Sequence, residues 1–345
     1  MSQETPIRVI QWATGRVGQA AIRHFARQPR FELAGVLVTS ADKVGRDAGV
    51  IAGIDEIGVI ATDSVDAILA IQADCVHYAP LAADLDSICR ILRAGKNVVS
   101  PSGYVYPTDY NRADIDRIEA ACRAGGTSYH GTGIHPGFAG DILPLVMARL
   151  MSRIDRIQVY EYVDFAANPS PWAARLGFGG DPAATRANPS RGEHVVQIFG
   201  ESMAMLVEGL GKRIERVTTE FDVATATRDL DLPSGRIRAG TVGGMHYDWT
   251  GWVDGRPFLR FHQVWTMGEG VEPNWGTGNN QYRLLIEGDP GVSMVFEAPP
   301  GQEGDAGLIW TAMNGVHAIP QVCAAAPGLV THLDLGIVKP SCLFA

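Results

Sequence analysis

The chain has 345 residues, of which 46% are hydrophobic and 19% charged, and its formal net charge is −9. This composition is typical of a globular protein, and the length predicts two domains. The acidic charge is spread along the chain, which excludes the clustered Lys and Arg of a nucleic-acid-binding protein.

The N-terminus and the cysteines indicate the compartment. The opening stretch MSQETPIRV lacks the basic start and apolar middle of a signal peptide. No window reaches the roughly 18 apolar residues that a membrane span requires. The five cysteines form no C-x-x-C pair and show no zinc spacing, which favours reduced thiols. We therefore expect a cytoplasmic protein with a small-molecule substrate.

From residue 7 to about residue 130, short apolar runs alternate with amphipathic stretches. The expected strands are IRVIQWA at 7–13, FELAGVLVTS at 31–40, ADCVHYA at 73–79, KNVVSP at 96–101 and TSYHGTG at 127–133. The expected helices cover 17–28, 65–72, 85–95 and 111–126. This alternation predicts a doubly wound parallel sheet over 1–138, with ligands at the carboxyl ends of the strands.

After about residue 140 the pattern changes. A helical stretch at 140–153 is followed by runs that alternate apolar and polar residues and are separated by turns. These runs predict an antiparallel sheet with one covered face. The expected second domain is thus an α+β substrate domain over 139–308, built on an open antiparallel sheet. A C-terminal helix and tail, 309–345, is expected to return to the first domain.

The stretch ATGRVG at 13–18 stands between the first strand and the first helix. It matches the dinucleotide-binding pattern G-x-G-x-x-G except that Ala13 replaces the first glycine. Gly15 lets the backbone approach a pyrophosphate and Gly18 lets helix and strand pack, while Ala13 can serve if its φ stays negative. The alternative is an ordinary strand–helix turn. The residues expected at the cofactor are Ala13, Thr14, Gly15, Arg16, Val17 and Gly18.

The end of the second strand bears on which dinucleotide binds. Thr39 and Ser40 stand where an NAD site places an acidic residue, and Asp42 comes later, between Ser40 and the cations Lys43 and Arg46. Hydroxyls and cations suit a 2′-phosphate, so NADP(H) is favoured while NAD remains open. The alternative is that these are solvated loop charges.

Two loops after later strands carry candidate catalytic groups. In GTGIHPGF, the residues Gly131, Thr132 and Gly133 lead to His135, which could donate a proton or orient the nicotinamide; it could also only hydrogen-bond the loop. In PSGYVYP, Tyr104 and Tyr106 are the candidate donors to a carbonyl, or else core residues.

Further along the chain, Trp172 lies in the loop NPSPWAARLGFGG and is expected to wall a substrate pocket. The histidines show neither an i, i+4 pair nor an H-x-H pair near carboxylates, so no metal site is expected.

Together, QWATGRVG, VTSADKVGRDAG, GKNVVS, GTGIHPGF and VHAIPQVCAAAPG resemble the dihydrodipicolinate reductase-like oxidoreductases. The most similar branch is that of the 2,4-diaminopentanoate dehydrogenases and native amine dehydrogenases, with their actinobacterial homologues. The resemblance implies a Rossmann domain, a substrate domain with an open antiparallel sheet, an NAD(P)H cofactor and a homodimer. It also implies that Gly15 to Gly18 lie at the pyrophosphate, Ser40 and Lys43 near the 2′ position, and Gly131 to Gly137 along the nicotinamide.

Three departures from the family pattern concern the chemistry. The amine-forming branch has a loop similar to A-E-E-M-A-Y-P, whereas this chain has Ser102 and Gly103 in place of the two acids. His135 and His317 replace asparagines of the family, with His317 expected on the cofactor side and Gly103 in the substrate pocket. The dicarboxylate-binding segment of true dihydrodipicolinate reductases is absent, so lysine biosynthesis is not expected.

Three functions follow from these departures. The first is NADPH-dependent reduction of a small-to-medium, mostly apolar ketone or aldehyde, because an alkoxide needs only a donor such as His135, Tyr104 or Tyr106. The second is an amine dehydrogenase or 2,4-diaminopentanoate dehydrogenase type of reaction, in which another acid such as Glu161 replaces the missing one. The third is a non-catalytic NADP(H)-binding sensor.

Overall fold

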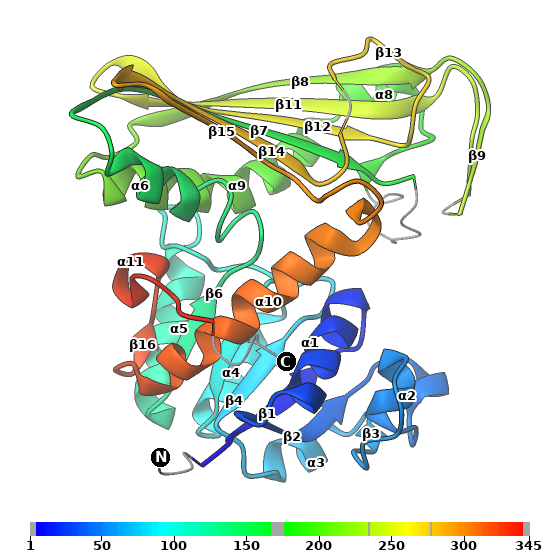
Figure 1. Ribbon diagram of the computed structural model, residues 1–345, viewed down its shortest axis with the longest axis vertical. Helices are drawn as coiled ribbons and strands as arrows, with labels where there is room; N and C mark the ends of the chain where they lie inside the picture. Colours follow the sequence, from blue (N-terminus) through cyan, green and yellow to red (C-terminus); the bar gives the residue numbers. More distant parts are fainter. Residues whose placement is uncertain (1–4, 167–175, 234, 277, 341–345) are drawn as a thin grey trace. The chain divides into compact units, whose positions relative to one another are not determined.

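The computed structural model describes residues 5–166, 176–233, 235–276 and 278–340. The chain divides into two compact units (Figure 1). The first consists of Met1–Phe138 together with Leu308–Ala345, and the second of Ala139–Gly307.

The first unit contains a seven-stranded sheet in the order β16-β6-β5-β4-β1-β2-β3, and every pairing described in it is parallel. The order reverses at β1, as in a doubly wound nucleotide-binding sheet, so the predicted fold class is confirmed. The strands are β1 Ile7–Trp12, β2 Phe31–Leu37, β3 Ala61–Thr62, β4 Cys75–Tyr78, β5 Asn97–Ser100, β6 Ser128–Gly131 and β16 Gly328–Leu329.

Helices cover both faces of this sheet. The helices are α1 Arg16–Arg27, the 3₁₀ helix η1 Ala41–Lys43, α2 Ala48–Ala52, α3 Val65–Ala70, α4 Leu85–Arg93, α5 Arg112–Gly125, α10 Glu303–Ala324 and α11 His332–Leu335. Val9 packs with α1, α2 and α10, whereas its neighbour Ile10 packs with α3, α4 and α5. Because successive side chains of a strand point to opposite faces, apolar strands with no polar face bury both sides of the sheet.

The second unit is built on a seven-stranded sheet in the order β13-β8-β11-β12-β7-β14-β15. Its pairings are antiparallel except that β12 and β7 run parallel, so the predicted antiparallel sheet is in fact mixed. The exception arises because β7, the first of these strands in the chain, is placed between β12 and β14. The strands are β7 Arg153–Asp164, β8 Arg216–Ala226, β11 Val242–Val253, β12 Arg256–Thr266, β13 Val271–Glu272, β14 Gln281–Asp289 and β15 Val292–Phe296.

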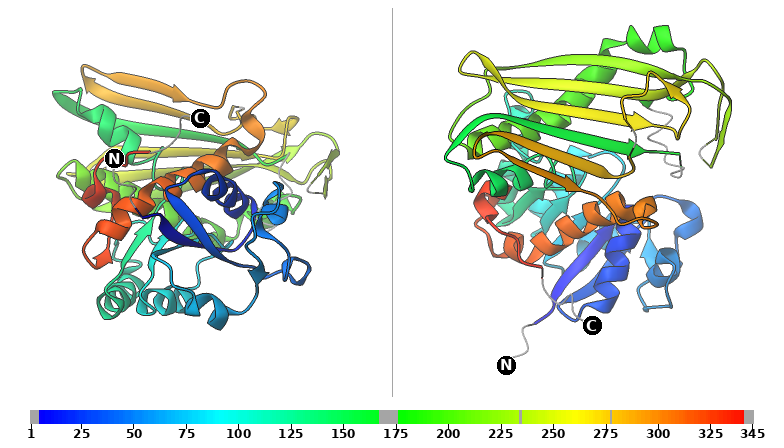
Figure 2. Two further views of the ribbon diagram at one scale, coloured as in Figure 1. Left: turned by 60° about the horizontal axis from the view of Figure 1, so that its bottom comes forward. Right: turned by 45° about the horizontal axis from the view of Figure 1, so that its top comes forward.

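The smaller elements of this unit are the hairpin of β9 Leu230–Leu232 and β10 Gly235–Ile237 and the helices α6 Ile142–Ala148, α8 Pro182–Arg186 and α9 Pro189–Gly209. α9 lies against one face of the sheet (Figure 1), where Tyr247, Trp249 and Phe261 form a buried cluster with Met203. In the described part of the unit no helix crosses the opposite face (Figure 2, right). We call these the covered face and the polar face.

None of the described helices is long and apolar enough to cross a membrane.

Candidate functional site

The turn between β1 and α1 has the shape of a pyrophosphate cradle. Ala13 adopts a φ of +70°, so the negative φ that was the condition for an alanine at this position is not met. An alanine in this region is strained by about 1–2 kcal/mol. A Cβ on Gly18 would lie 2.2 Å from the carbonyl oxygen of Ala13, so this close packing of helix on turn requires glycine at position 18.

The start of α1 is open to a ligand. Gly15 caps the helix without a side-chain hydrogen bond, and the first turn carries no acidic residue. A Cβ on Gly15 would meet no described atom within 4 Å. The N–H groups of a helix's first turn have no partner within the helix, so they and its positive end suit an anion, and these residues fit the pyrophosphate of a dinucleotide.

The loop after β2 is tied to this turn by Lys43. Its Nζ donates to the carbonyl oxygen of Thr14 at 3.0 Å and lies 3.3 Å from the Thr14 hydroxyl. Thr39 and Ser40 are exposed beside it, and Ser40 precedes the 3₁₀ helix η1. The structure thus brings together the predicted pyrophosphate turn and the residues predicted at the ribose.

A buried polar pair that the sequence analysis missed supports the turn. Gln11 Nε2 donates to the carbonyl of Ala13 at 2.8 Å, and Gln11 Oε1 accepts from His77 Nδ1 at 2.7 Å. Burial lowers the pKa of His77 to about 4, so the imidazole is neutral near pH 7. Gln11 and His77 are register partners on β1 and β4. The sequence signal was a polar residue within a run of buried apolar residues in each of two strands.

A second buried network holds the loop after β6. Thr132 is buried, and Asn314 Nδ2 on α10 donates to its hydroxyl and to the carbonyl of Gly133, each at 2.8 Å. Asn314 Nδ2 also donates to the carbonyl of Gly137 at 3.0 Å. His332 Nε2 lies 2.8 Å from the same Thr132 hydroxyl. The predicted nicotinamide loop is therefore fixed by two residues that the sequence analysis did not identify.

His135 lies at the tip of this loop and is half-buried. The loop closes tightly around it, because a Cβ on Gly137 would lie 2.3 Å from the backbone nitrogen of Gly133. Gly137 has a φ of +118°, which favours glycine. His135 thus lies in a tightly closed loop, and its role as a proton donor stays a prediction.

The loop after β5 places its tyrosines away from solvent. The Tyr104 hydroxyl donates to Asp114 of α5 at 3.0 Å, and Tyr106 is buried. The carbonyl of Gly103 accepts from the Tyr129 hydroxyl at 2.7 Å. Because the Tyr104 hydroxyl is engaged with α5, its role as a donor to substrate stays a prediction, as does that of Tyr106.

Two further predicted residues lie elsewhere. The ring of His317 packs edge-on against His24, in the last turn of α1, with ring centroids 5.1 Å apart. Burial lowers the pKa of His317 to about 4. The ring of His317 therefore faces the end of α1 opposite the glycine turn, and its contact with a cofactor stays a prediction. Trp172 lies outside the residues that the structure describes.

In the second unit, a carboxylate is buried on the covered face of the sheet. Glu161 on β7 is 5% exposed and accepts from Trp265 Nε1 at 2.8 Å. Its register partners are Gln263 on β12 and Tyr282 on β14. Burial and the charge of Glu161 raise the pKa of Tyr282 well above its ordinary value. We call Gln263, Glu161 and Tyr282 the Glu161 row.

Gln263 is the unusual member of the Glu161 row. It is fully buried, and neither its Nε2 nor its Oε1 has a hydrogen-bond partner among the described residues. Burying an amide without a partner costs about 1–3 kcal/mol. The row therefore buries a carboxylate and an amide on neighbouring strands of the covered face.

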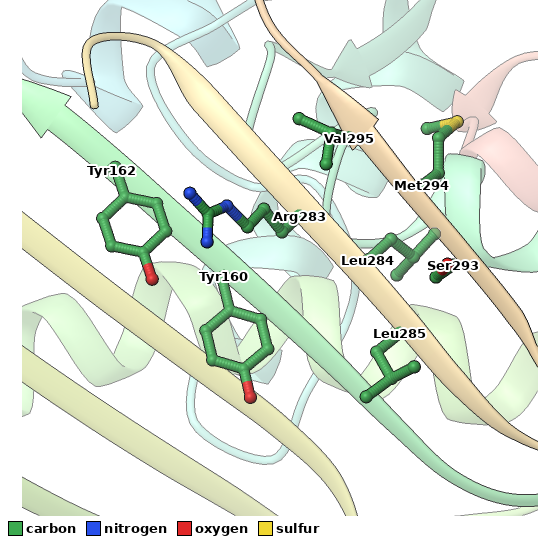
Figure 3. A pocket seen from close by; sticks show the side chains of 8 residues that line it. All are labelled: Tyr160, Tyr162, Arg283, Leu284, Leu285, Ser293, Met294 and Val295. Atoms are coloured by element: carbon green, nitrogen blue, oxygen red, sulfur yellow. The ribbon is translucent and has the colours of Figure 1, made fainter. Parts of the chain in front are cut away.

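A separate groove lies on the polar face (Figure 3). Its volume is about 380 Å³, and Tyr160, Tyr162 and Arg283 line it together with the edge strand β15. The guanidinium carbon of Arg283 is 5.2 Å from the centre of the Tyr162 ring. Since side chains alternate along β7, these tyrosines point away from the face that carries Glu161.

Two known protein families match different parts of the chain. Residues 138–343 match the family described as 2,4-diaminopentanoate dehydrogenase C-terminal domain. Residues 8–103 match the family described as dihydrodipicolinate reductase, N-terminus.

Curated relatives and solved structures agree with these families. An amine dehydrogenase of Streptomyces virginiae is 32% identical over 351 aligned positions, covering 95% of this chain and 96% of the relative. A 2,4-diaminopentanoate dehydrogenase of Acetoanaerobium sticklandii is 25% identical and covers 74% of this chain and 70% of the relative. Among solved structures, the amine dehydrogenase of Mycobacterium smegmatis superposes with a TM-score of 0.80 at 20% identity, over 99% of both chains. The chain is thus an oxidoreductase that belongs to the family of amine dehydrogenases and 2,4-diaminopentanoate dehydrogenases.

Proposed function

We propose that this protein is an NAD(P)H-dependent amine dehydrogenase, which interconverts an amine with a ketone or aldehyde and ammonia. The observation that carries the proposal is the buried carboxylate of Glu161, in the unit that matches the 2,4-diaminopentanoate dehydrogenase family. The loop after β5 has Ser102 and Gly103 where that branch carries acids, so a carboxylate must come from elsewhere. The relatives' activity and this carboxylate together favour C=N chemistry over the carbonyl reduction that the loop alone suggested.

The chemistry assigns a proton step to Glu161. In the reductive direction, ammonia adds to the carbonyl carbon, and the resulting carbinolamine takes up one proton and loses water, which gives an iminium ion. When bound, NADPH would supply the hydride that reduces the iminium carbon. Glu161 stabilises the cationic nitrogen and, in the oxidative direction, accepts the proton that the amine loses. The indole N–H of Trp265 donates to one oxygen of this carboxylate and so holds the side chain in place.

The cofactor is proposed to be NADPH in preference to NADH. Lys43 is held at the turn, exposed Thr39 and Ser40 lie beside it, and Arg46 adds a second cation in the same loop. These groups suit a 2′-phosphate, which carries two negative charges and several acceptor oxygens. The ratio of kcat/KM for NADPH to that for NADH is expected to exceed one, and a ratio below one contradicts the preference.

The test of the reaction is ammonium dependence. Purified protein is supplied with NADPH and a panel of apolar ketones and aldehydes, with and without ammonium chloride at constant ionic strength. We expect NADPH oxidation only when ammonium is present. Equal rates in both conditions would establish carbonyl reduction instead, and tight NADPH binding with no turnover in either would favour the sensor function. The homodimer, also a proposal, is tested by sedimentation of the same sample.

A further inference from the structure

A cluster of potential metal ligands lies on the polar face of the second unit. His246 and Asp248 alternate along β11 and so point to the same face, and His262 is the register partner of Asp248 on β12. One donor atom from each of these three side chains lies within 4.8 Å of the other two. Within the residues that the structure describes, this is the one such group of three. Spacing along the chain could not reveal it, because the ligands come from two strands.

The cluster is partly desolvated and its members are held in place. The side chain of Asp248 is 4% exposed and that of His262 is 12% exposed. Asp248 Oδ2 lies 2.8 Å from His262 Nδ1, and Asp248 Oδ1 accepts from Arg260 Nε at 2.7 Å. Burial acts to raise the pKa of Asp248, but the hydrogen bonds from His262 and Arg260 outweigh it and lower the pKa. The carboxylate is therefore ionised near pH 7.

The two imidazoles are oriented by aromatic neighbours. His262 stacks on Tyr160, with ring centroids 4.3 Å apart, and His246 packs against Trp275 at 5.2 Å. The two imidazole planes are nearly parallel, at 6°, with centroids 6.4 Å apart. Burial lowers the pKa of His246, so this ring is neutral and has a lone pair to offer.

His262 presents Nδ1 to the carboxylate of its neighbour on β11. Nδ1 faces the carboxylate of Asp248, whereas Nε2 is buried without a hydrogen-bond partner among the described residues. A cation bound between Asp248 and His262 would replace this contact.

The net charge of the side chains around the cluster determines whether a divalent cation can bind near the guanidinium group of Arg260. On β8, Asp222 is the register partner of His246 and Glu220 is the register partner of Asp248. Asp222 is in turn paired with Arg186 at 2.6 Å. The three carboxylates thus exceed the two guanidinium groups, which leaves this part of the face negative.

We propose that His246, Asp248 and His262 form a binding site for a divalent transition-metal ion, with Zn²⁺ as the best match. Two imidazoles and one carboxylate are ligands that Zn²⁺ accepts, whereas Mg²⁺ and Ca²⁺ prefer oxygen alone. Bonds of about 2.0–2.2 Å put tetrahedral ligands roughly 3.3 Å apart. The donors must therefore close by on the order of an ångström, which rotation of the half-buried His246 side chain supplies.

Such an ion would join β11 to β12 on the face opposite to the Glu161 row, with water as its fourth ligand. The site would thus be a structural link between neighbouring strands, and it does not depend on the proposed reaction.

The test is a metal titration of full-length protein without a histidine tag, after treatment with EDTA. We expect one equivalent of Zn²⁺ to bind per chain, and Co²⁺ to give the intense visible absorption of a tetrahedral site with nitrogen ligands. H246A and H262A should each weaken Zn²⁺ binding at least tenfold. H24Q, which removes a histidine outside the cluster, should leave Zn²⁺ affinity unchanged.

H246A is the decisive variant, because it leaves the contacts of Asp248 with His262 and Arg260 in place. Circular dichroism of the metal-free variants checks that they are folded. This check matters most for H262A, which removes the contact of His262 with Asp248. Zn²⁺ that raises the melting temperature of the wild type and not that of H246A supports the site. The absence of saturable Zn²⁺ binding, or equal binding by wild type and H246A, would overturn it.

Discussion

The glycine turn of the first unit and the Glu161 row of the second are built from different parts of the polypeptide. The turn depends on the backbone: Gly15 has no side chain to fill the open start of α1, and Gly18 lies against the carbonyl of Ala13. The row depends on side chains that three strands bring into register. The first kind of site is lost when an atom is added, and the second when a functional group is removed.

The largest effect is expected at Glu161. E161Q keeps the shape of the side chain and its bond from Trp265 but removes the charge, so amine turnover should fall by about 10²–10⁴-fold, as when a general base is lost. Affinity for NADPH, measured by fluorescence, should not change. E287Q is the matched control on the neighbouring strand β14 and should retain full activity. An E161Q enzyme with normal turnover would remove this carboxylate from the mechanism.

The two glycines of the turn should respond differently to a methyl group. G15A places its Cβ where no described atom lies, so the variant should fold normally but bind NADPH about tenfold or more weakly, because the methyl enters the space of the pyrophosphate. G18A forces its Cβ against backbone and should lose about 1–3 kcal/mol of unfolding free energy as well. Equal stability of the two variants, measured by urea unfolding, would refute the distinction.

The buried pair beneath the turn predicts a dependence on pH. The pKa of His77 is lowered to about 4 in the fold, so only the unfolded chain takes up a proton as the pH falls below about 6.5. The contribution of the buried, neutral His77 to the unfolding free energy is thus fully present above this pH. It is lost as the pH falls toward 4. When the pH is lowered from about 7 to about 5, the unfolding free energy of the wild type should fall by roughly 2 kcal/mol more than that of H77Q. Parallel losses in the two proteins would contradict this.

The smallest effect is expected at Ala13. Its φ of +70° is strained for alanine, so A13G should raise the unfolding free energy by about 1 kcal/mol. The same change at Ala20, inside α1, should lower it, because glycine weakens a helix interior. A lower unfolding free energy for A13G than for the wild type, measured by urea unfolding, would show that the positive φ of Ala13 costs little in this turn.

The sequence predicts the fold well where local pattern and fold agree. Apolar runs alternating with amphipathic stretches suffice for the doubly wound sheet, and the turn is recognised by Gly15 and Gly18. The parallel pairing of β7 with β12 was not predicted, because alternation along a strand reports which face is buried and not which strand lies beside it. The positive φ of Ala13 was not predicted, since alanine alone favours negative φ and only the tertiary fold forces the opposite.

The supporting residues of the site were harder to predict for the same reason. Asn314 reaches Thr132 from α10, at the other end of the chain, and Gln11 meets His77 through the pairing of β1 with β4. His246 and His262 likewise become neighbours only through the register of β11 and β12. These contacts depend on long-range register, which a single sequence does not encode in any local pattern.

The central claim is that the substrate carbon is reduced as an iminium and not as a carbonyl. It is tested most directly by the nitrogen content of the product. Wild-type protein is incubated with NADPH, an apolar ketone and ¹⁵N-labelled ammonium, and the products are identified by mass spectrometry. The account predicts an amine that carries the ¹⁵N label in amounts equal to the NADPH consumed. An alcohol formed in those amounts, with no labelled amine, would contradict it.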